Sequence, residues 1–117
     1  MKGLIVVFLA LFVMMSAQAS YAQQTIYGMG RHSCGKYITA LEGYRQNNHQ
    51  GSLEYFEFLC WFYGFATAVS GTLYEDILHG KDNDAITLWL EKYCRAHPMD
   101  EFIVASINLV GGLRGKK

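Results

Sequence analysis

One stretch of the sequence, residues 52–73, limits the folds open to this chain more than any other. It reads SLEYFEFLCWFYGFATAVSGTL, and its charged residues end at Glu57. A helix that is apolar on nearly every face must be surrounded by protein or by lipid. The uncharged part is shorter than the roughly 20 residues that cross a bilayer. We therefore expect a central helix, capped by Ser52 and packed inside a small domain, in which Gly64 lets a neighbouring helix approach closely.

Three further segments have the apolar spacing of amphipathic helices. The first follows a Ser33 cap, ends before a polar loop at 46–51, and is expected to bury Cys34, Tyr37, Ile38, Leu41 and Tyr44. The next ends at Pro98 and is expected to bury Ile86, Trp89, Leu90, Tyr93 and Cys94. The last follows an Asp100 cap and is expected to bury Phe102, Ile103, Ser106, Ile107, Val110 and Leu113. Because no segment alternates with period two, we predict an all-α fold, a small four-helix orthogonal bundle over residues 33–113.

Residues 1–22 have the layout of a secretory signal peptide. Lys2 gives a positive start, an unbroken apolar run covers 4–15, and small residues follow. Such a run is short for a membrane span, and small residues favour cleavage by signal peptidase. We expect cleavage after Ala22, with Ala19 as the second choice and an uncleaved anchor as the alternative. Cleavage would release the mature chain as an exported protein.

The mature chain is one small domain of nearly balanced charge. All ten acidic residues and all ten basic residues except Lys2 lie beyond residue 22, so its formal net charge is −1. This balance gives no support for nucleic-acid binding, which needs concentrated positive charge. We expect an extended lead-in at 23–32 and a solvated basic tail at 114–117. A core of this size usually needs a covalent crosslink or a partner.

Three cysteines in an exported chain allow three single bridges, each of which leaves one thiol free. Cys34 opens the first helix and Cys94 lies late in the third, both on apolar faces. Antiparallel packing of these helices would bring the two residues together, so we predict a Cys34–Cys94 bridge. Cys60 lies in the most apolar run and is expected to be a buried core residue. A nucleophilic Cys60 is the less favoured reading, because it would need an exposed thiolate in an electropositive site.

No grouping of residues in the sequence indicates catalysis, a metal or a cofactor. Four histidines are scattered through helix ends and loops, without metal-ligand spacing: His32, His49, His79 and His97. Glu75 and Asp76 are adjacent, so their side chains point to different sides of the chain and make a poor acid–base pair. We therefore expect a protein that is not an enzyme and that has no cofactor.

Several short motifs resemble the HdeA/HdeB group of small exported helical proteins. They are Ser33-Cys34 at the start of the first helix, Trp61 in the second, and YCRAHP at residues 93–98. The sequences YGMG at 27–30 and WLEKYC at 89–94 are similar to those of the broader HdeA-like set. The resemblance covers residues 33 to about 113 and implies the same pairing of the first and last cysteines. The chain differs from the group in a longer spacing between these cysteines and in the additional third one.

The resemblance implies a periplasmic acid-stress chaperone, often dimeric at neutral pH, that loosens in acid and binds unfolding periplasmic proteins. Full protonation would take the mature chain from −1 to +13, and self-repulsion would then oppose the compact state. The aromatic helix would supply the client-binding surface, with these candidate residues: Phe56, Trp61, Phe62 and Phe65. Neither nucleic acid nor a stable membrane span is expected.

A second resemblance indicates a different class of function. The run from Cys60 to Gly64 and the helix end at His97-Pro98 are similar to the Rap/Tai-type immunity proteins of type VI secretion. These proteins bind and block a toxic effector, so the resemblance implies a folded recognition surface that acts at neutral pH. A helical periplasmic binding module without a specified partner is the third interpretation.

Overall fold

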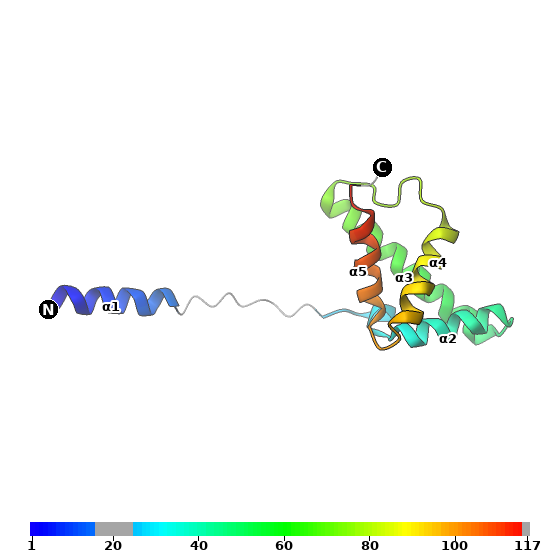
Figure 1. Cartoon of the computed structure of the whole chain (residues 1–117), viewed down its shortest axis with the longest axis horizontal. Helices are drawn as coiled ribbons and strands as arrows, with labels where there is room; N and C mark the ends of the chain where they lie inside the picture. Colours follow the sequence, from blue (N-terminus) through cyan, green and yellow to red (C-terminus); the bar gives the residue numbers. More distant parts are fainter. Residues whose placement is uncertain (16–24, 116–117) are drawn as a thin grey trace.

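The computed structural model describes residues 1–15 and 25–115, and all regular structure in these residues is helical (Figure 1). In chain order the elements are α1 (Lys2–Met15), the 3₁₀ helix η1 (Gly28–Arg31), α2 (Cys34–Arg45), α3 (His49–Leu73), α4 (Asn83–Ala96) and α5 (Phe102–Leu113). The predicted all-α class is therefore confirmed. The predicted cleavage positions, Ala19 and Ala22, and the last two residues of the basic tail lie outside the described residues.

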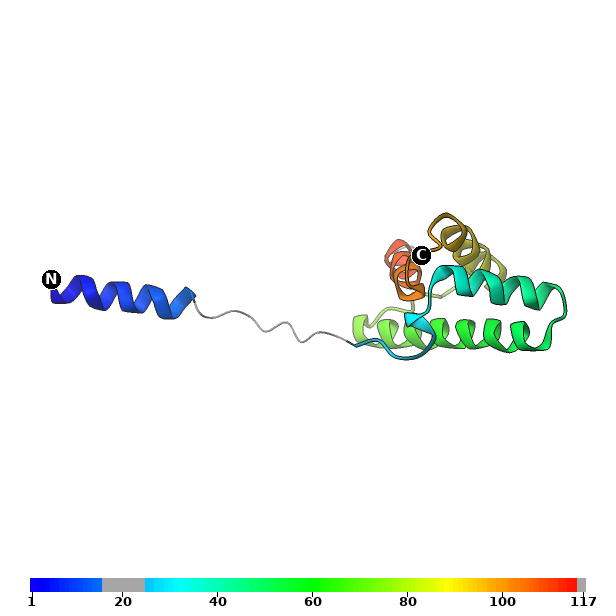
Figure 2. The same ribbon diagram turned by 90° about the horizontal axis from the view of Figure 1, so that it is seen from below.

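Helices α2 and α3 form an antiparallel pair that organises the domain (Figure 2). They approach most closely where two glycines face each other. A Cβ atom added to Gly51 would lie 2.7 Å from the Cα atom of Gly43. The predicted close approach at Gly64 is wrong, since a Cβ atom there would have nothing within 4 Å. The close contact lies near the start of α3 instead, because α2 is short and covers only the first half of α3.

Helices α4 and α5 cross α2 steeply and close the core on one side of the pair (Figures 1 and 2). The largest fully buried side chains come from all four domain helices: Tyr37, Phe58, Phe62, Leu90 and Phe102. Aromatic rings meet at the centre, where Phe102 lies 4.9 Å from Phe58 and 5.0 Å from Tyr37 between ring centroids. Among the described residues, no helix has the length and hydropathy needed to cross a membrane.

The predicted disulfide is confirmed: Cys34 and Cys94 are bonded, with their Cα atoms 4.7 Å apart. Around it, backbone hydrogen bonds join the start of α2 to the segment between α4 and α5. The amide of Cys34 donates to the carbonyl of Asp100 at 2.7 Å, and the amide of Phe102 donates to the carbonyl of His32 at 2.8 Å. The bridge closes a loop over 60 positions. Such closure contributes roughly 4 kcal/mol in the chain-entropy model.

Two predicted helix starts are wrong. Helix α3 begins at His49, not at Ser52, because Asn48 caps it by accepting the amide proton of Gly51 at 2.9 Å. The tight turn at Asn47, whose φ is 56°, lets the polar residues of the expected loop enter the helix. Helix α5 has Glu101 at its N-cap, with no side-chain cap. The carboxylate of Asp100, the expected cap, accepts a hydrogen bond from the Tyr93 hydroxyl instead, at 2.7 Å.

Most of the predicted buried positions lie in the core, with two clear exceptions. Tyr44 is 42% exposed and Ile107 is 54% exposed. Tyr44 lies in the last turn of α2, where the ring of Tyr55 stacks on one side of it, 4.9 Å away between centroids. Three further residues are buried that the helical periodicity did not predict: Ala40, Ala105 and Leu109. The two alanines are small and let the helices come close.

Candidate functional site

The four aromatic residues predicted to bind clients do not form one surface in the folded chain. Phe62 is fully buried in the core, and Phe56 is half exposed at the other side of α3. Trp61 and Phe65 lie together, with parallel rings whose centroids are 5.5 Å apart. The sequence identified side chains that an opened domain would expose, but their positions on the helix put them on different faces. Their role in binding stays a prediction.

Trp61 holds the segment before α2 against α3. Its indole N–H donates to the carbonyl oxygen of Tyr27 at 3.0 Å. The six-membered part of the ring lies so close to Gly30 that a Cβ atom there would be 2.1 Å from it. The lead-in predicted as extended therefore contains the short helix η1, and its second glycine is buried under the tryptophan. The pair of glycines at 28 and 30 was a usable signal for such a close contact.

Phe56 belongs to a small apolar patch, which we call the α2–α3 tip patch. It consists of Tyr44, Leu53 and Phe56, which are between 42% and 50% exposed. Phe56 meets Tyr44 edge to face at 5.4 Å between centroids. The folded chain therefore keeps three large apolar side chains half exposed on this helix pair.

Cys60 is exposed, and the prediction that it is buried is wrong. Helices α2 and α5 and the short helix η1 pack against α3, and Cys60 stays uncovered by the residues that the structure describes. Gly64 and Gly71, on the same uncovered side, have no neighbouring heavy atom within 4 Å of an added Cβ. An apolar run alone therefore did not reveal which of its faces would be buried.

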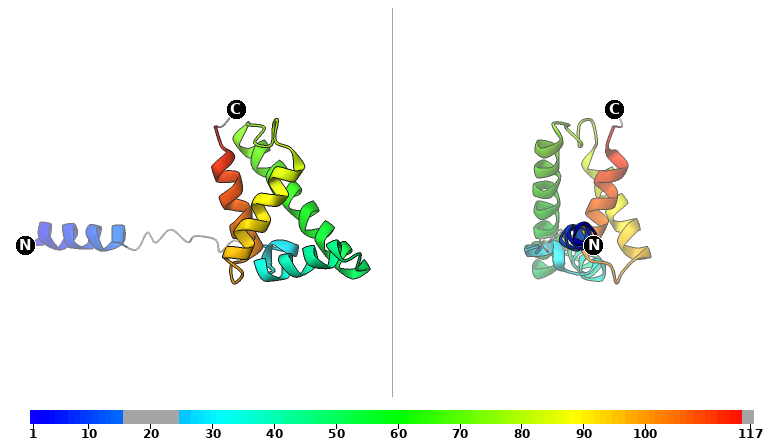
Figure 3. Two further views of the ribbon diagram at one scale, coloured as in Figure 1. Left: turned by 45° about the vertical axis from the view of Figure 1, so that its right-hand side comes forward. Right: turned by 90° about the vertical axis from the view of Figure 1, so that its left-hand side faces the viewer.

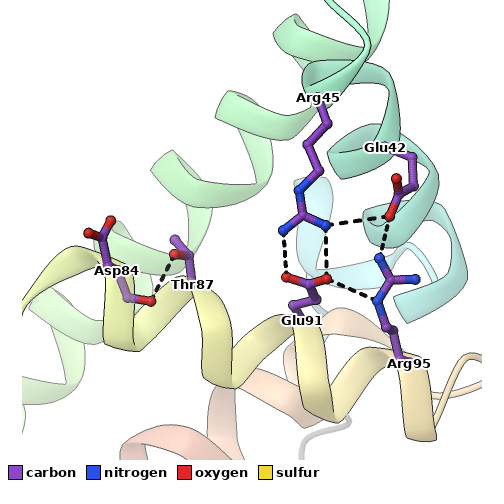
Figure 4. A network of polar contacts seen from close by, with 6 residues as sticks. All are labelled: Glu42, Arg45, Asp84, Thr87, Glu91 and Arg95. Atoms are coloured by element: carbon purple, nitrogen blue, oxygen red, sulfur yellow. Dashed lines mark hydrogen bonds and ion pairs between the residues drawn. The ribbon is translucent and has the colours of Figure 1, made fainter.

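The most connected polar site in the described structure is a network of two carboxylates and two guanidinium groups between α2 and α4 (Figure 4). Glu91 of α4 receives two parallel hydrogen bonds from Arg45 of α2, at 2.9 and 2.8 Å. It also accepts one from Arg95 at 3.0 Å, and Arg95 reaches across to Glu42 of α2. Paired hydrogen bonds between arginine and a carboxylate are among the stronger polar contacts in proteins.

Glu91 is the centre of this network, and its side chain is only 14% exposed. Hydrogen bonding to Arg45 is the largest influence and lowers the pKa of the Glu91 carboxyl; Arg95 acts in the same direction and burial opposes them. Arg45, Arg95 and Glu42 are each more than 40% exposed, so the outer contacts are screened by water. The network thus depends on one carboxylate that must stay ionised.

A buried hydroxyl lies in the interior of the domain. The hydroxyl of Tyr37 is buried and has no hydrogen-bond partner among the described residues. Burial, together with the nearby Tyr55 and Glu91, raises the pKa of Tyr37.

Part of the network was visible in the sequence. Glu42 and Arg45 are three positions apart on one helix, and Glu91 and Arg95 are four apart on another, which are the spacings of helical ion pairs. The cross-helix contacts depend on the approach of α4 to α2, which periodicity does not give. Among the described residues, no group of three or more His, Cys, Asp or Glu side chains is placed to hold a metal ion.

Comparisons of the chain with protein-family models, with curated proteins and with solved structures find no match.

Proposed function

We propose that this chain is an exported acid-stress chaperone of the HdeA/HdeB kind, folded at neutral pH and opened by acid to bind unfolding proteins. The proposal includes a leader cleaved after Ala22, a periplasmic location and the predicted four-helix orthogonal arrangement. It needs no cofactor and no catalytic residue. The observation that carries it is the Glu91 network, because a contact between helices that depends on ionised carboxylates is weakened by acid.

The direction of the pH effect follows from the pKa of Glu91. Its carboxyl has a lowered pKa in the folded chain, so it contributes stability above its unfolded pKa, which is about 4.3. That contribution is lost as the pH falls through the lowered folded value. Protonation of Glu91 and Glu42 also leaves Arg45 and Arg95 close together without a counter-charge. Their mutual repulsion then opposes the contact between α2 and α4.

The disulfide sets how far the opening goes. The bridge ties the end of α4, at Cys94, to the start of α2, at Cys34. Acid would therefore separate the rest of α4 from α2 while these two helix ends stay attached. The apolar side chains that α4 buries, Ile86 and Leu90, would then reach solvent together with the core residue Phe62. Such a surface has the composition that binds unfolding chains through apolar contact.

The direct test measures protection of a client. The oxidised chain from residue 23 onward is mixed with an aggregation-prone periplasmic protein at about pH 2.5 and at about pH 7. We expect light scattering by the client to be suppressed in acid and unchanged at neutral pH. A chain that fails to suppress aggregation in acid while exposing apolar surface would overturn the chaperone function.

The network itself is tested by Glu91→Gln, which removes the ionisable group but keeps the shape. We expect a loss of about 1 kcal/mol in the free energy of unfolding at pH 7, and a smaller difference from the wild type as the pH falls below the unfolded pKa of about 4.3 towards the lowered folded value. Urea unfolding at about pH 7 and at about pH 4, the lowest pH at which the wild type is expected to stay folded, measures this. Glu57→Gln, at an exposed carboxylate of α3 outside the network, is the matched control and should change neither value.

A second candidate function is supported by the α2–α3 tip patch. Its half-exposed apolar residues are present in the folded chain, as the Rap/Tai-type resemblance requires of a protein that blocks an effector at neutral pH. Retention of a specific protein partner at pH 7, lost on Phe56→Ala, would favour this function. The chaperone proposal expects Phe56→Ala to leave neutral-pH behaviour unchanged.

A further inference from the structure

The second half of α3 and the second half of α5 enclose an apolar groove that the proposed function does not use. Both helices end at the same end of the domain (Figures 1 and 3). The groove has a volume of about 710 Å³ and is lined by Phe65, Ala68, Val69, Thr72, Leu73, Ile107, Val110, Gly111 and Arg114. Pockets of 300 to 1,000 Å³, by order of magnitude, hold small organic ligands. Leu73 and Ile107 are exposed along it, so a ligand can enter.

The walls of this groove offer almost no polar group to a ligand. The hydroxyl of Thr72 donates to the carbonyl of Ala68 in its own helix at 3.0 Å. The one charged residue among those that line the groove is Arg114, the C-cap residue of α5. None of the ion pairs among the described residues involves Arg114, in contrast to the arginines of the Glu91 network. The nearby carboxylate of Glu75 accepts a hydrogen bond from the amide of Gly115.

We propose that this groove binds a single-chain carboxylate amphiphile, such as a free fatty acid, with the hydrocarbon chain along α3 and α5 and the carboxylate at Arg114. Apolar walls favour removal of the chain from water. A guanidinium group that forms no ion pair with another described residue favours a carboxylate over a neutral or cationic head group. The volume suits one ligand molecule, which is why a single-chain amphiphile is chosen over a membrane surface.

Gly111 makes the groove testable without damage to the core. It lines the groove, and a Cβ atom added to it would meet no heavy atom within 4 Å. A leucine at this position therefore fills the groove and is expected to improve helix propensity. Gly112, the next residue of the same helix, also has open space but does not line the groove. Gly112→Leu is thus a matched control for Gly111→Leu.

The experiment titrates the ¹⁵N-labelled, oxidised chain at neutral pH with dodecanoate below its micellar concentration, followed by amide chemical shifts. Dodecyltrimethylammonium and dodecyl maltoside serve as cationic and neutral probes with the same chain length. We expect saturable shifts in residues 65–73 and 107–114, and dodecanoate affinity at least about tenfold above that of the cationic probe. Gly111→Leu should weaken dodecanoate at least about tenfold, whereas Gly112→Leu should not. Arg114→Gln should remove the preference for the anionic head, and Lys36→Gln on α2 should not.

Several results would overturn the proposal. Equal affinity for the three probes, or equal effects of the two glycine variants, would show that the groove does not select this ligand. Shifts centred on the α2–α3 tip patch would place the ligand elsewhere. Binding to anionic phospholipid vesicles without saturable binding of monomeric dodecanoate would indicate a membrane surface as the occupant. Concentration-dependent dimerisation without ligand, abolished by Gly111→Leu, would indicate a second copy of the chain.

Discussion

The two halves of α3 have similarly apolar sequences but different surroundings. In the first half, residues 49–62, α2 lies so close that two glycines touch, and α4 is held over α2 by the Glu91 network and the disulfide. In the second half, residues 63–73, glycines face open space and an apolar groove runs beside α5. An apolar helix is thus buried only as far as its neighbours extend. The first half supports a fold that acid can open, and the second supports a binding surface in the folded state.

The largest expected effect of a substitution in α3 comes from the buried face of its first half. Phe62 is fully buried, so Phe62→Ala should lower the free energy of unfolding by about 3 to 5 kcal/mol. Phe56 is half exposed on the same helix, and Phe56→Ala should lower the free energy of unfolding by less than about 1 kcal/mol. Urea unfolding of both variants gives the comparison. Similar losses for the two would mean that Phe56 is covered, and the α2–α3 tip patch would not exist.

A smaller effect is expected where α2 and α3 touch. In Gly51→Ala the added methyl group would lie 2.7 Å from the Cα atom of Gly43, so the two helices must move apart. Despite the better helix propensity of alanine, we expect a net loss of about 1 to 3 kcal/mol. Gly43→Ala disturbs the same contact, so the double variant should lose less than the sum of the single losses. Thermal or urea unfolding measures the three variants. A stabilised Gly51→Ala would show that the helices do not approach closely here.

The smallest effect, with the opposite sign, is expected in the second half. Gly64 lies in the interior of α3 with open space around it. Gly64→Ala should therefore raise the free energy of unfolding by about 0.5 to 1 kcal/mol through helix propensity alone. A loss of stability in the monomeric chain would reveal a contact that covers this face. The pair Gly51→Ala and Gly64→Ala tests the difference between the two halves with one kind of change.

Much of the fold followed from the sequence, because the relevant signals are local or periodic. The stripe of α4 predicted its buried residues, and the positions of Cys34 and Cys94 at opposite helix ends predicted their bridge. The start of α3 was misplaced because the sequence QNNHQG looks like a loop, whereas Asn48 caps a helix that includes its last three residues. The exposure of Cys60 was missed for a different reason: burial of an apolar helix depends on the length of its neighbours, which composition does not show.

The candidate site was less predictable than the fold. The aromatic residues were recognised by type, but their distribution over the core, the tip patch and the η1 contact depends on tertiary packing. In the Glu91 network, Arg45 and Glu91 are 46 positions apart in the sequence and lie on different helices. Only the two pairs within single helices have a spacing that can be recognised in the sequence. The groove beside α5 depends on how α3 and α5 lie next to one another, which helical periodicity does not give.

The central claim is that acid opens the domain while the bridge stays intact, and a pH titration of the oxidised chain tests it most directly. Near-ultraviolet circular dichroism and binding of an apolar dye are followed from pH 7 to about pH 2, for the wild type and for Glu91→Gln. We predict that tertiary signal is lost and dye binding rises below about pH 4 in the wild type, and that both changes begin at higher pH in Glu91→Gln. A wild-type chain that keeps its tertiary signal and binds no dye throughout would contradict acid opening.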